Sequence, residues 1–208
     1  GTALDITDGA SPGNEGSVSV TGTAVLNTSG NLTLKSSANG TARIGQGAVG
    51  GGYINGDVIV ERYLGAKRAW RFLSVPAYGQ TIKQSWQENQ PAGVNPGTGY
   101  GTMITSNSAT WAADGFDFSS NTSSILAYNP TGNNWPAYPN TTSQITSSGA
   151  NKSYMLFTRG DRSITPAMGT GATPTPVILR TKGTLFQGNQ PAVAVSSAGQ
   201  FAAIGNNY

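Results

Sequence analysis

Residues 57–64 have the sequence Asp-Val-Ile-Val-Glu-Arg-Tyr-Leu, and residues 69–75 have the sequence Ala-Trp-Arg-Phe-Leu-Ser-Val. β-Branched and aromatic residues are frequent in both stretches, and these residue types favour the extended backbone of a strand. Neither stretch contains Gly or Pro, which weaken or interrupt strands. We therefore predict that these stretches form the two strongest strands of the chain and decide its fold.

The chain before these strands is predicted to form a thin, turn-rich β-layer. Residues 1–62 contain no Trp and no Phe, and short apolar/polar alternations are separated by Gly, Asn and Ser. Asn-Gly pairs at 39–40 and 55–56 are strong hairpin signals. The spacing is too uneven for a strict repeat, so stacked rungs and a meander both fit the pattern. The predicted strands are 17–20, 23–26, 31–35, 41–44 and 57–63.

The second part of the chain is predicted to hold the main core. All four Trp and all six Phe lie after residue 69. We expect Trp70, Phe72, Leu156 and Phe157 to contribute to this core, and only 81–88 has a helical pattern. Further strands are predicted at 101–105, 124–128, 153–158, 176–181, 184–187, 192–195 and 201–204.

These elements together predict an all-β fold. A β-sandwich-like main domain at 63–208 would follow a rung-like strand and turn segment at 1–62, and the two could form one continuous unit.

The composition excludes several classes of chemistry. The chain of 208 residues has no His and no Cys, so His-dependent and Cys-dependent nucleophile systems and thiolate or imidazole metal sites are absent. Only 10% of residues are charged, the net charge is +3, and no Lys/Arg run is longer than Lys67-Arg68. Nucleic-acid binding is therefore not supported. The apolar runs are too short for membrane insertion. Because the chain lacks His and Cys, we do not expect an enzyme.

Several blocks of sequence occur in an order typical of one group of proteins. They are GNLTLKSSANGTARIG at 30–45, GDVIVERY at 56–63, RAWRFLS at 68–74, SWQE at 85–88, GYGT at 99–102, GFD at 115–117, YMLFTRGDR at 154–162 and FAAIGN at 201–206. The chain resembles large, β-rich surface and secreted proteins of Bacteroidota that carry a type IX secretion signal. The resemblance implies an extracellular or cell-surface location and a segment of a longer product, but no activity. Residues 205–208 read Gly-Asn-Asn-Tyr where that family has Gly-Asn-Pro-Tyr.

The few carboxylates suggest no catalytic pair. A glycosidase needs two carboxyl groups facing each other across a cleft, and Asp114 and Asp117 are only the nearest such pair in sequence. The same pair, or Asp5 with Asp8, could supply oxygen ligands to a structural calcium ion, although Asx-turns explain both more simply. No other cofactor is expected.

Two sequence patterns that contain arginine each have a structural and a functional interpretation. Arg-Gly-Asp at 159–161 is an adhesive tripeptide in other settings, but its place between predicted strands favours a tight turn. Arg68, Trp70 and Phe72 fall on one side of a strand, where they could form a structural ladder or bind a ligand, and we favour the ladder.

The leading functional hypothesis is a non-catalytic structural or adhesive module of the cell surface. It would pair with itself or with neighbouring modules as a fibre or filament subunit. The pairing strands would contain Leu4 and Ile6 at one end and Phe201 and Ile204 at the other. The alternative is a carbohydrate-binding module for surface glycans that uses loop aromatics. The candidate ligand-binding residues are Trp111, Trp135 and Tyr138.

Overall fold

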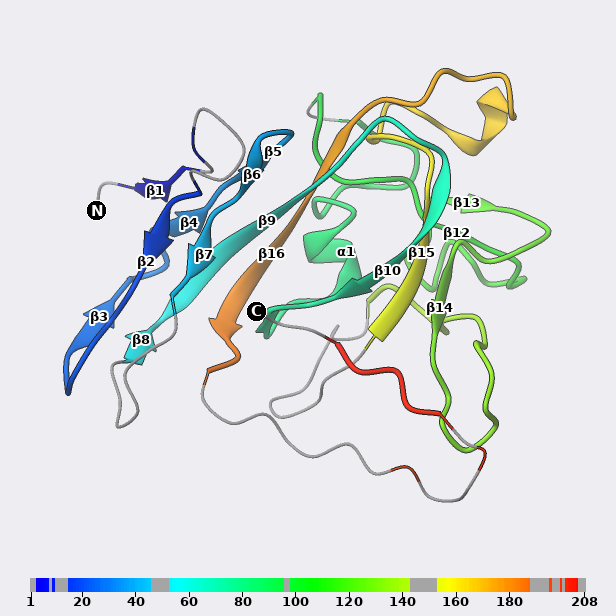
Figure 1. The fold of residues 1–208 in the computed structure, drawn as a ribbon. Helices are drawn as coiled ribbons and strands as arrows, with labels where there is room; N and C mark the ends of the chain where they lie inside the picture. The colour runs from blue at the N-terminus through cyan, green and yellow to red at the C-terminus, as the bar shows by residue number, and fades with distance from the viewer. Residues whose placement is uncertain are drawn as a thin grey trace.

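The computed structural model describes residues 3–7, 9, 15–45, 53–95, 98–142, 153–187, 195, 199 and 201–205. It confirms an all-β, sandwich-like fold with several sheets and one short α-helix (Figure 1). The N-terminal strands are β1 (Leu4–Ile6), β2 (Ser17–Val18), β3 (Val25–Asn27), β4 (Leu32–Leu34), β5 (Ser36–Ser37), β6 (Gly40–Thr41), β7 (Arg43–Ile44), β8 (Tyr53–Asn55) and β9 (Asp57–Leu64). The following elements are β10 (Ala69–Ser74), β11 (Ala77–Tyr78), α1 (Ile82–Ser85), β12 (Thr105–Ser106), β13 (Phe118–Ser119), β14 (Ile125–Ala127), β15 (Ser153–Thr158), the 3-10 turn Pro166–Met168 and β16 (Val177–Leu185).

The N-terminal strands stack as parallel rungs. β1 pairs with β4 and β4 with β9, while β2 pairs with β7 and β3 with β8, and all of these pairs are parallel. Leu4 lies beside Leu32, an offset of 28 residues, whereas Ser17 lies beside Arg43, an offset of 26. The rung alternative is therefore the correct one, and the unequal offsets explain why no strict repeat is visible in the sequence.

A second hydrophobic core fills the inside of these rungs. The pairing stacks Leu32 directly on Val58 and Leu26 on Ile54, so aliphatic side chains form continuous inward-facing columns. The buried members of this core are Leu32, Leu34, Ala42, Ile54, Val58, Ala77 and Leu185. A thin layer without Trp or Phe is thus stabilised by stacking similar side chains from successive rungs.

The two Asn-Gly signals have different outcomes. The pair at 39–40 joins β5 to β6 in an antiparallel hairpin, as predicted. The hairpin predicted at 55–56 is wrong, because β8 and β9 pair with the preceding rung and not with each other. Gly56 has φ +94° and forms a corner there, and a Cβ atom would lie 2.8 Å from Oγ1 of Thr28. Both a hairpin and a rung corner need this left-handed backbone, so the local sequence does not distinguish them.

The main body consists of two sheets around a larger core. The five-stranded sheet has the order β1-β4-β9-β16-β11, and the three-stranded sheet has the order β10-β15-β14. The long strands β9 and β16 are antiparallel, and β9 crosses residues 62 and 63 without a break. The core between the sheets contains Leu64, Val75, Ile82, Trp86, Ile104, Phe116, Ile125, Tyr138, Tyr154, Leu156, Val177 and Leu179.

The helical turn predicted at 81–88 is confirmed as α1. Thr81 caps its N-terminus by accepting a hydrogen bond from the amide of Gln84, whose side chain accepts one from the amide of Thr81. This reciprocal capping box satisfies two amide groups that a helix start leaves without partners. Ile82 and Trp86 then reach the core between the sheets.

Two further sequence-based expectations, about the core and about a strand near residue 201, are wrong. Trp70 and Phe72 were expected in the core, but they are 41% and 72% exposed, because the side chains of Leu73 and Leu156 from the opposite face fill it. Leu156 is buried as expected, and Phe157 is half-buried. The predicted strand at 201–204 is also absent, since residues 201–205 form no regular structure and Phe201 is 69% exposed. Most of the strand expected at 192–195 lies outside the described residues.

These positions give a test of the core assignment. Leu156→Ala removes a fully buried side chain and should lower the free energy of unfolding by about 2–5 kcal/mol. Phe72→Ala removes an exposed side chain and should cost less than about 1 kcal/mol. Urea denaturation followed by fluorescence measures both values. Equal losses for the two variants would contradict the assigned faces of the three-stranded sheet.

Candidate functional site: an aromatic face and an open rung

The most deeply buried polar cluster centres on Arg162. The guanidinium group of Arg162 is fully buried and forms an ion pair of 2.8 Å with Asp117, which is 1% exposed. It also donates to the carbonyl oxygens of Val94 at 2.9 Å, Pro91 at 3.2 Å and Thr102 at 3.3 Å. All nitrogen atoms of the group are therefore paired, as a charge removed from water requires.

The carboxylate of Asp117 is fully engaged by the same cluster. Besides Arg162, it accepts hydrogen bonds from Nε2 of Gln87 at 2.9 Å and from the amide of Ile104 at 2.8 Å. Asp114 lies in a separate turn, where the hydroxyl groups of Ser108 and Thr110 donate to it. The Asp114/Asp117 pair thus serves two structural turns and does not face a shared cleft.

The described residues offer no assembled metal centre. No group of three or more Asp or Glu side chains that could hold a metal ion occurs among them. Asp5 lies in β1 with a carboxylate oxygen 3.7 Å from Nζ of Lys35, whereas Asp8 lies outside the described residues. Asp114 and Asp117, the other calcium ligands considered, have separate structural partners, and the Asp5/Asp8 alternative lies partly outside the described residues.

The Arg-Gly-Asp tripeptide forms a structural turn. Asp161 is 1% exposed and accepts hydrogen bonds from the amide of Gly99 at 2.7 Å and from the amide and hydroxyl groups of Ser163. Gly160 has φ +147°, and a Cβ atom there would lie 2.8 Å from the amide nitrogen of Thr175. The carboxylate that an adhesive tripeptide presents to a receptor is here directed into the protein.

The three candidate sugar-binding aromatics have different surroundings. Tyr138 is buried, its ring packs edge-on against Tyr154, and burial raises the pKa of its hydroxyl group. Trp111 is half-buried and packs against the main core. Trp135 is half-buried and contacts Phe72, with ring centroids 5.6 Å apart. Of the three, Trp135 alone touches an exposed aromatic side chain in these contacts.

Trp135 belongs to an aromatic face on the outer side of the three-stranded sheet, made of Trp70, Phe72, Tyr128, Trp135 and Phe157. The centroids of Trp70 and Phe157 are 5.4 Å apart, and those of Tyr128 and Trp135 are 5.2 Å apart. The planes of the contacting rings are inclined by 53° to 66°, so the rings form a ridged row and not a flat platform. The sequence pattern places Trp70 and Phe72 on the same side of the strand, but it does not show that this side faces solvent.

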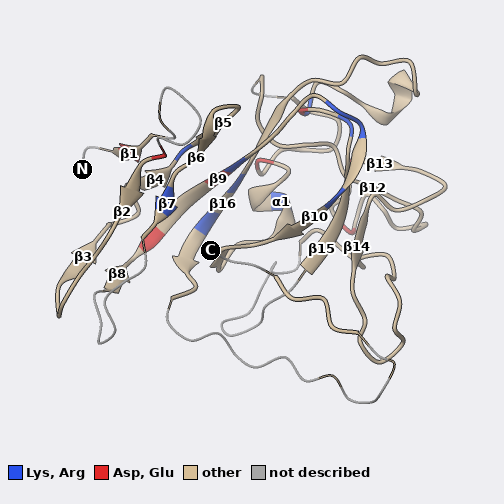
Figure 2. Ribbon diagram, viewed as in Figure 1, with Lys and Arg blue, Asp and Glu red and all other residues tan. Residues whose placement is uncertain are grey.

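Two arginine side chains flank this aromatic face. The guanidinium carbon of Arg159 lies 4.9 Å from the centroid of Phe157, and that of Arg68 lies 5.9 Å from it. Figure 2 shows basic residues on the turn that leads into β10. The sequence placed Arg68, Trp70 and Phe72 on one side of a strand, whereas Arg159 joins them only through pairing of β10 with β15.

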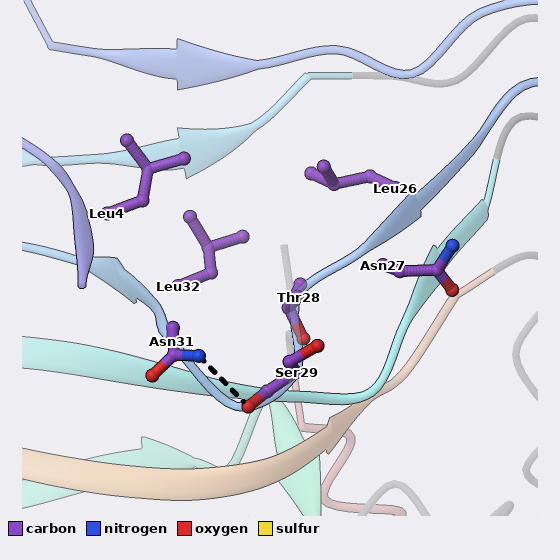
Figure 3. A pocket seen from close by; sticks show the side chains of 7 residues that line it. All are labelled: Leu4, Leu26, Asn27, Thr28, Ser29, Asn31 and Leu32. Atoms are coloured by element: carbon purple, nitrogen blue, oxygen red, sulfur yellow. Dashed lines mark hydrogen bonds between the residues drawn. The ribbon is translucent and has the colours of Figure 1, made fainter. Parts of the chain in front are cut away.

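A second candidate site is the open rung, formed by β1, β2 and β3. Within the described residues, no strand pairs with the outer edge of any of these three strands. Leu4 and Val25 are 52% and 55% exposed there. An open hollow of about 380 Å³ lies at this end, and the side chains of Leu4, Leu26 and Leu32 surround it (Figure 3).

The polar rim of this hollow shows how the rungs fit together. Nδ2 of Asn55 donates to Oδ1 of Asn27 on the preceding rung at 2.8 Å. Nδ2 of Asn31 donates to the carbonyl oxygen of Ser29 at 3.2 Å, which closes the turn between β3 and β4 (Figure 3). Amide groups that stack from rung to rung form a ladder that a further rung can extend.

Comparison with known protein families, curated proteins and solved structures finds no match for the chain. Within the described part of the protein, no helix combines the length and the hydrophobicity that crossing a membrane requires.

The Arg162–Asp117 pair gives a prediction about stability. Arg162→Met leaves the carboxylate of Asp117 buried without its counter-ion, so the free energy of unfolding should fall by about 3–5 kcal/mol. Arg43→Met replaces an exposed arginine on β7 and should change the free energy of unfolding by less than about 0.5 kcal/mol. Both values come from urea denaturation, and similar small losses would show that the buried ion pair does not hold the surrounding loops.

The Asp161 turn predicts a dependence of stability on pH. Burial alone would raise the pKa of Asp161, but hydrogen bonds from Ser163, Gly99 and Thr175 outweigh burial and lower this pKa. Because the pKa of Asp161 is lower in the folded than in the unfolded protein, its ionised carboxylate stabilises the fold. This stabilisation is complete at pH values above the pKa of the unfolded protein, about 3.9, and is lost as the pH falls through the pKa of the folded protein.

Wild type should therefore be more stable than Asp161→Asn at pH 7, and the difference should shrink below about pH 4. Thermal unfolding between pH 7 and pH 2 measures this difference. A difference that stays constant over the whole range would contradict the role given to the Asp161 carboxylate.

Proposed function

We propose that the protein is a non-catalytic structural and adhesive module of an extracellular surface protein, and that it joins a neighbouring copy or module through the open rung. The observation that carries this proposal is the outer edge of β1, which no described strand pairs with, beside a hollow lined by three leucines and a polar rim. Unpaired strand edges present N–H and C=O groups to which another strand can bind. Exposed leucine and valine side chains at the same end add a hydrophobic contribution.

The strand directions favour joining copies in a row. β1 and β11 form opposite edges of the five-stranded sheet. β1 runs parallel to β9 through β4, and β11 is antiparallel to β16, which is itself antiparallel to β9. Both edges therefore run in the same direction, and copies placed edge to edge would continue the sheet. Head-to-tail contacts of this kind build filaments when the rotation between copies does not close into a ring.

The non-catalytic and extracellular parts of the proposal have separate support. The chain lacks His and Cys, and the carboxylates of Asp117 and Asp161 are bound to structural partners. The blocks of sequence that resemble Bacteroidota surface proteins support a cell-surface location. Of the two ends first considered for assembly, we retain Leu4 and Ile6, since Phe201 and Ile204 lie in a segment without a strand.

A second candidate function is carbohydrate binding. The observation that favours it is the aromatic face on the outer side of the three-stranded sheet, where Trp70 and Phe72 are exposed. Aromatic rings with both an exposed face and fixed neighbours are suited to packing against sugar rings. This face shares no residue with the open rung, so the two functions can coexist in one molecule.

The assembly proposal predicts that a charged open rung prevents association. Leu4→Lys/Val25→Lys places two ammonium groups at exposed positions on β1 and β3, where pairing with a neighbour would remove them from water. Wild type should form oligomers joined edge to edge as its concentration rises, and the variant should stay monomeric. Size-exclusion chromatography with light scattering and negative-stain microscopy measure both.

The matched control is Val94→Lys/Met168→Lys, which changes two comparably exposed apolar residues outside the rungs. This control should associate like wild type, and thermal unfolding should confirm that both variants are folded. A wild-type protein that stays monomeric at all concentrations, or an open-rung variant that assembles normally, would overturn the proposed mode of assembly.

A further inference from the structure

Arg68 and Arg159 form a pair of positive charges to which no described carboxylate is paired. Within the described residues, the ion pairs of basic side chains involve Lys35, Arg162 and Arg180, and neither member of this pair. Nη1 of Arg68 donates to the carbonyl oxygen of Gly169 at 2.7 Å. Nη1 of Arg159 is buried and has no hydrogen-bond acceptor among the described residues.

The pair is held together by the fold and not by mutual attraction. Both guanidinium groups lie over the ring of Phe157, one from β10's leading turn and the other from the end of β15. Burial, and then the neighbouring charge of Arg68, lower the pKa of Arg159. Two like charges beside one ring, with an N–H group left without an acceptor, are an arrangement that a bound anion would stabilise.

The neighbouring surface indicates what carries the anion. Trp70 lies directly opposite Phe157 in the strand pairing and is 41% exposed, and Phe72 continues the same row. Aromatic rings prefer partners with flat, weakly polar faces, such as the faces of sugar rings, and guanidinium groups bind carboxylates through two parallel hydrogen bonds. The ring of Trp70 is inclined by 59° to that of Phe157 and the ring of Phe72 by 66° to that of Trp135, so the face is ridged and suits a single polymer chain better than a flat crystalline surface.

We propose that this face binds an acidic polysaccharide, with a uronate carboxylate at Arg68 and Arg159 and adjacent sugar rings on Trp70 and Phe72. The proposal rests on the second candidate function, carbohydrate binding, and narrows it to polymers that carry carboxylates. It is independent of assembly through the open rung. An acidic peptide would satisfy the two arginines, but it would leave the aromatic row without a matching partner.

The test measures binding of three polymers to the full chain by isothermal titration calorimetry in about 150 mM salt, where long-range attraction is largely screened. The probes are alginate oligomers as the polyuronate, dextran as the neutral polysaccharide, and polyglutamate as a polyanion without sugar rings. The expected result is binding of alginate and at least about tenfold weaker binding of the other two. Binding to dextran as strong as to alginate would retain carbohydrate binding but overturn its acidic specificity.

Equal binding to polyglutamate would identify the face as a general anion site and overturn the glycan assignment. No binding to any probe would overturn both the inference and the second candidate function.

Variants locate the site on the surface. Arg68→Gln/Arg159→Gln and Trp70→Ala/Phe72→Ala should each weaken alginate binding about tenfold or more. The matched controls are Arg43→Gln and Tyr53→Ala, which change an exposed arginine and an exposed tyrosine on the rungs and should bind alginate like wild type. Circular dichroism and thermal unfolding establish that each variant is folded. Unchanged binding in either double variant would place the polymer elsewhere.

Discussion

The strand β9 is the element on which the rest of the structure depends. It pairs in parallel with β4 on one edge and antiparallel with β16 on the other, so it belongs to both the rungs and the sandwich. Its side chains do the same, because Val58 is buried in the rung core and Leu64 in the main core. A slip of one residue would turn both side chains away from their cores, which fixes the register on both sides. The rungs and the sandwich are therefore positioned by a single run of eight residues.

Much of the fold could be predicted because its strands are local features. The strands β9, β10 and β15 consist of short runs rich in β-branched and aromatic residues, which favour the strand conformation. The capping box of α1 is also formed by residues close together in the sequence. The partner of each strand is not a local property. Gly56 satisfies a hairpin turn and a rung corner equally well, and only the stacking of Ile54 on Leu26 decides between them. Period-two alternation likewise separates Trp70 from Arg71 without showing which of them faces the core.

The candidate site was harder to predict because its residues meet through the fold. Arg162 and Asp117 are 45 positions apart, and nothing near either residue indicates the other. The tripeptide at 159–161 looks adhesive as a motif, but its aspartate is needed inside the turn. Arg159 reaches Arg68 only because β15 pairs with β10. Burial also separated the predicted aromatics, since Tyr138 joins the core while Trp135 stays near the surface.

The placement of carboxylates inside the protein also shapes its outer charge. Asp117 is buried against Arg162, while Glu61 and Asp161 are buried as acceptors of backbone amides, including that of Ser36 at 3.2 Å from Glu61. Arg162 balances the charge of Asp117, and Lys35, at 3.3 Å, balances that of Glu61, whereas Asp161 is satisfied by hydrogen bonds within the fold. Among the described residues, three carboxylates but only one basic side chain, Arg162, are buried, so the exposed surface is more basic than the net charge of +3 suggests. An anionic polymer approaching the aromatic face would thus meet a surface with few negative charges to repel it. Its attraction to the basic residues would weaken as salt screens it.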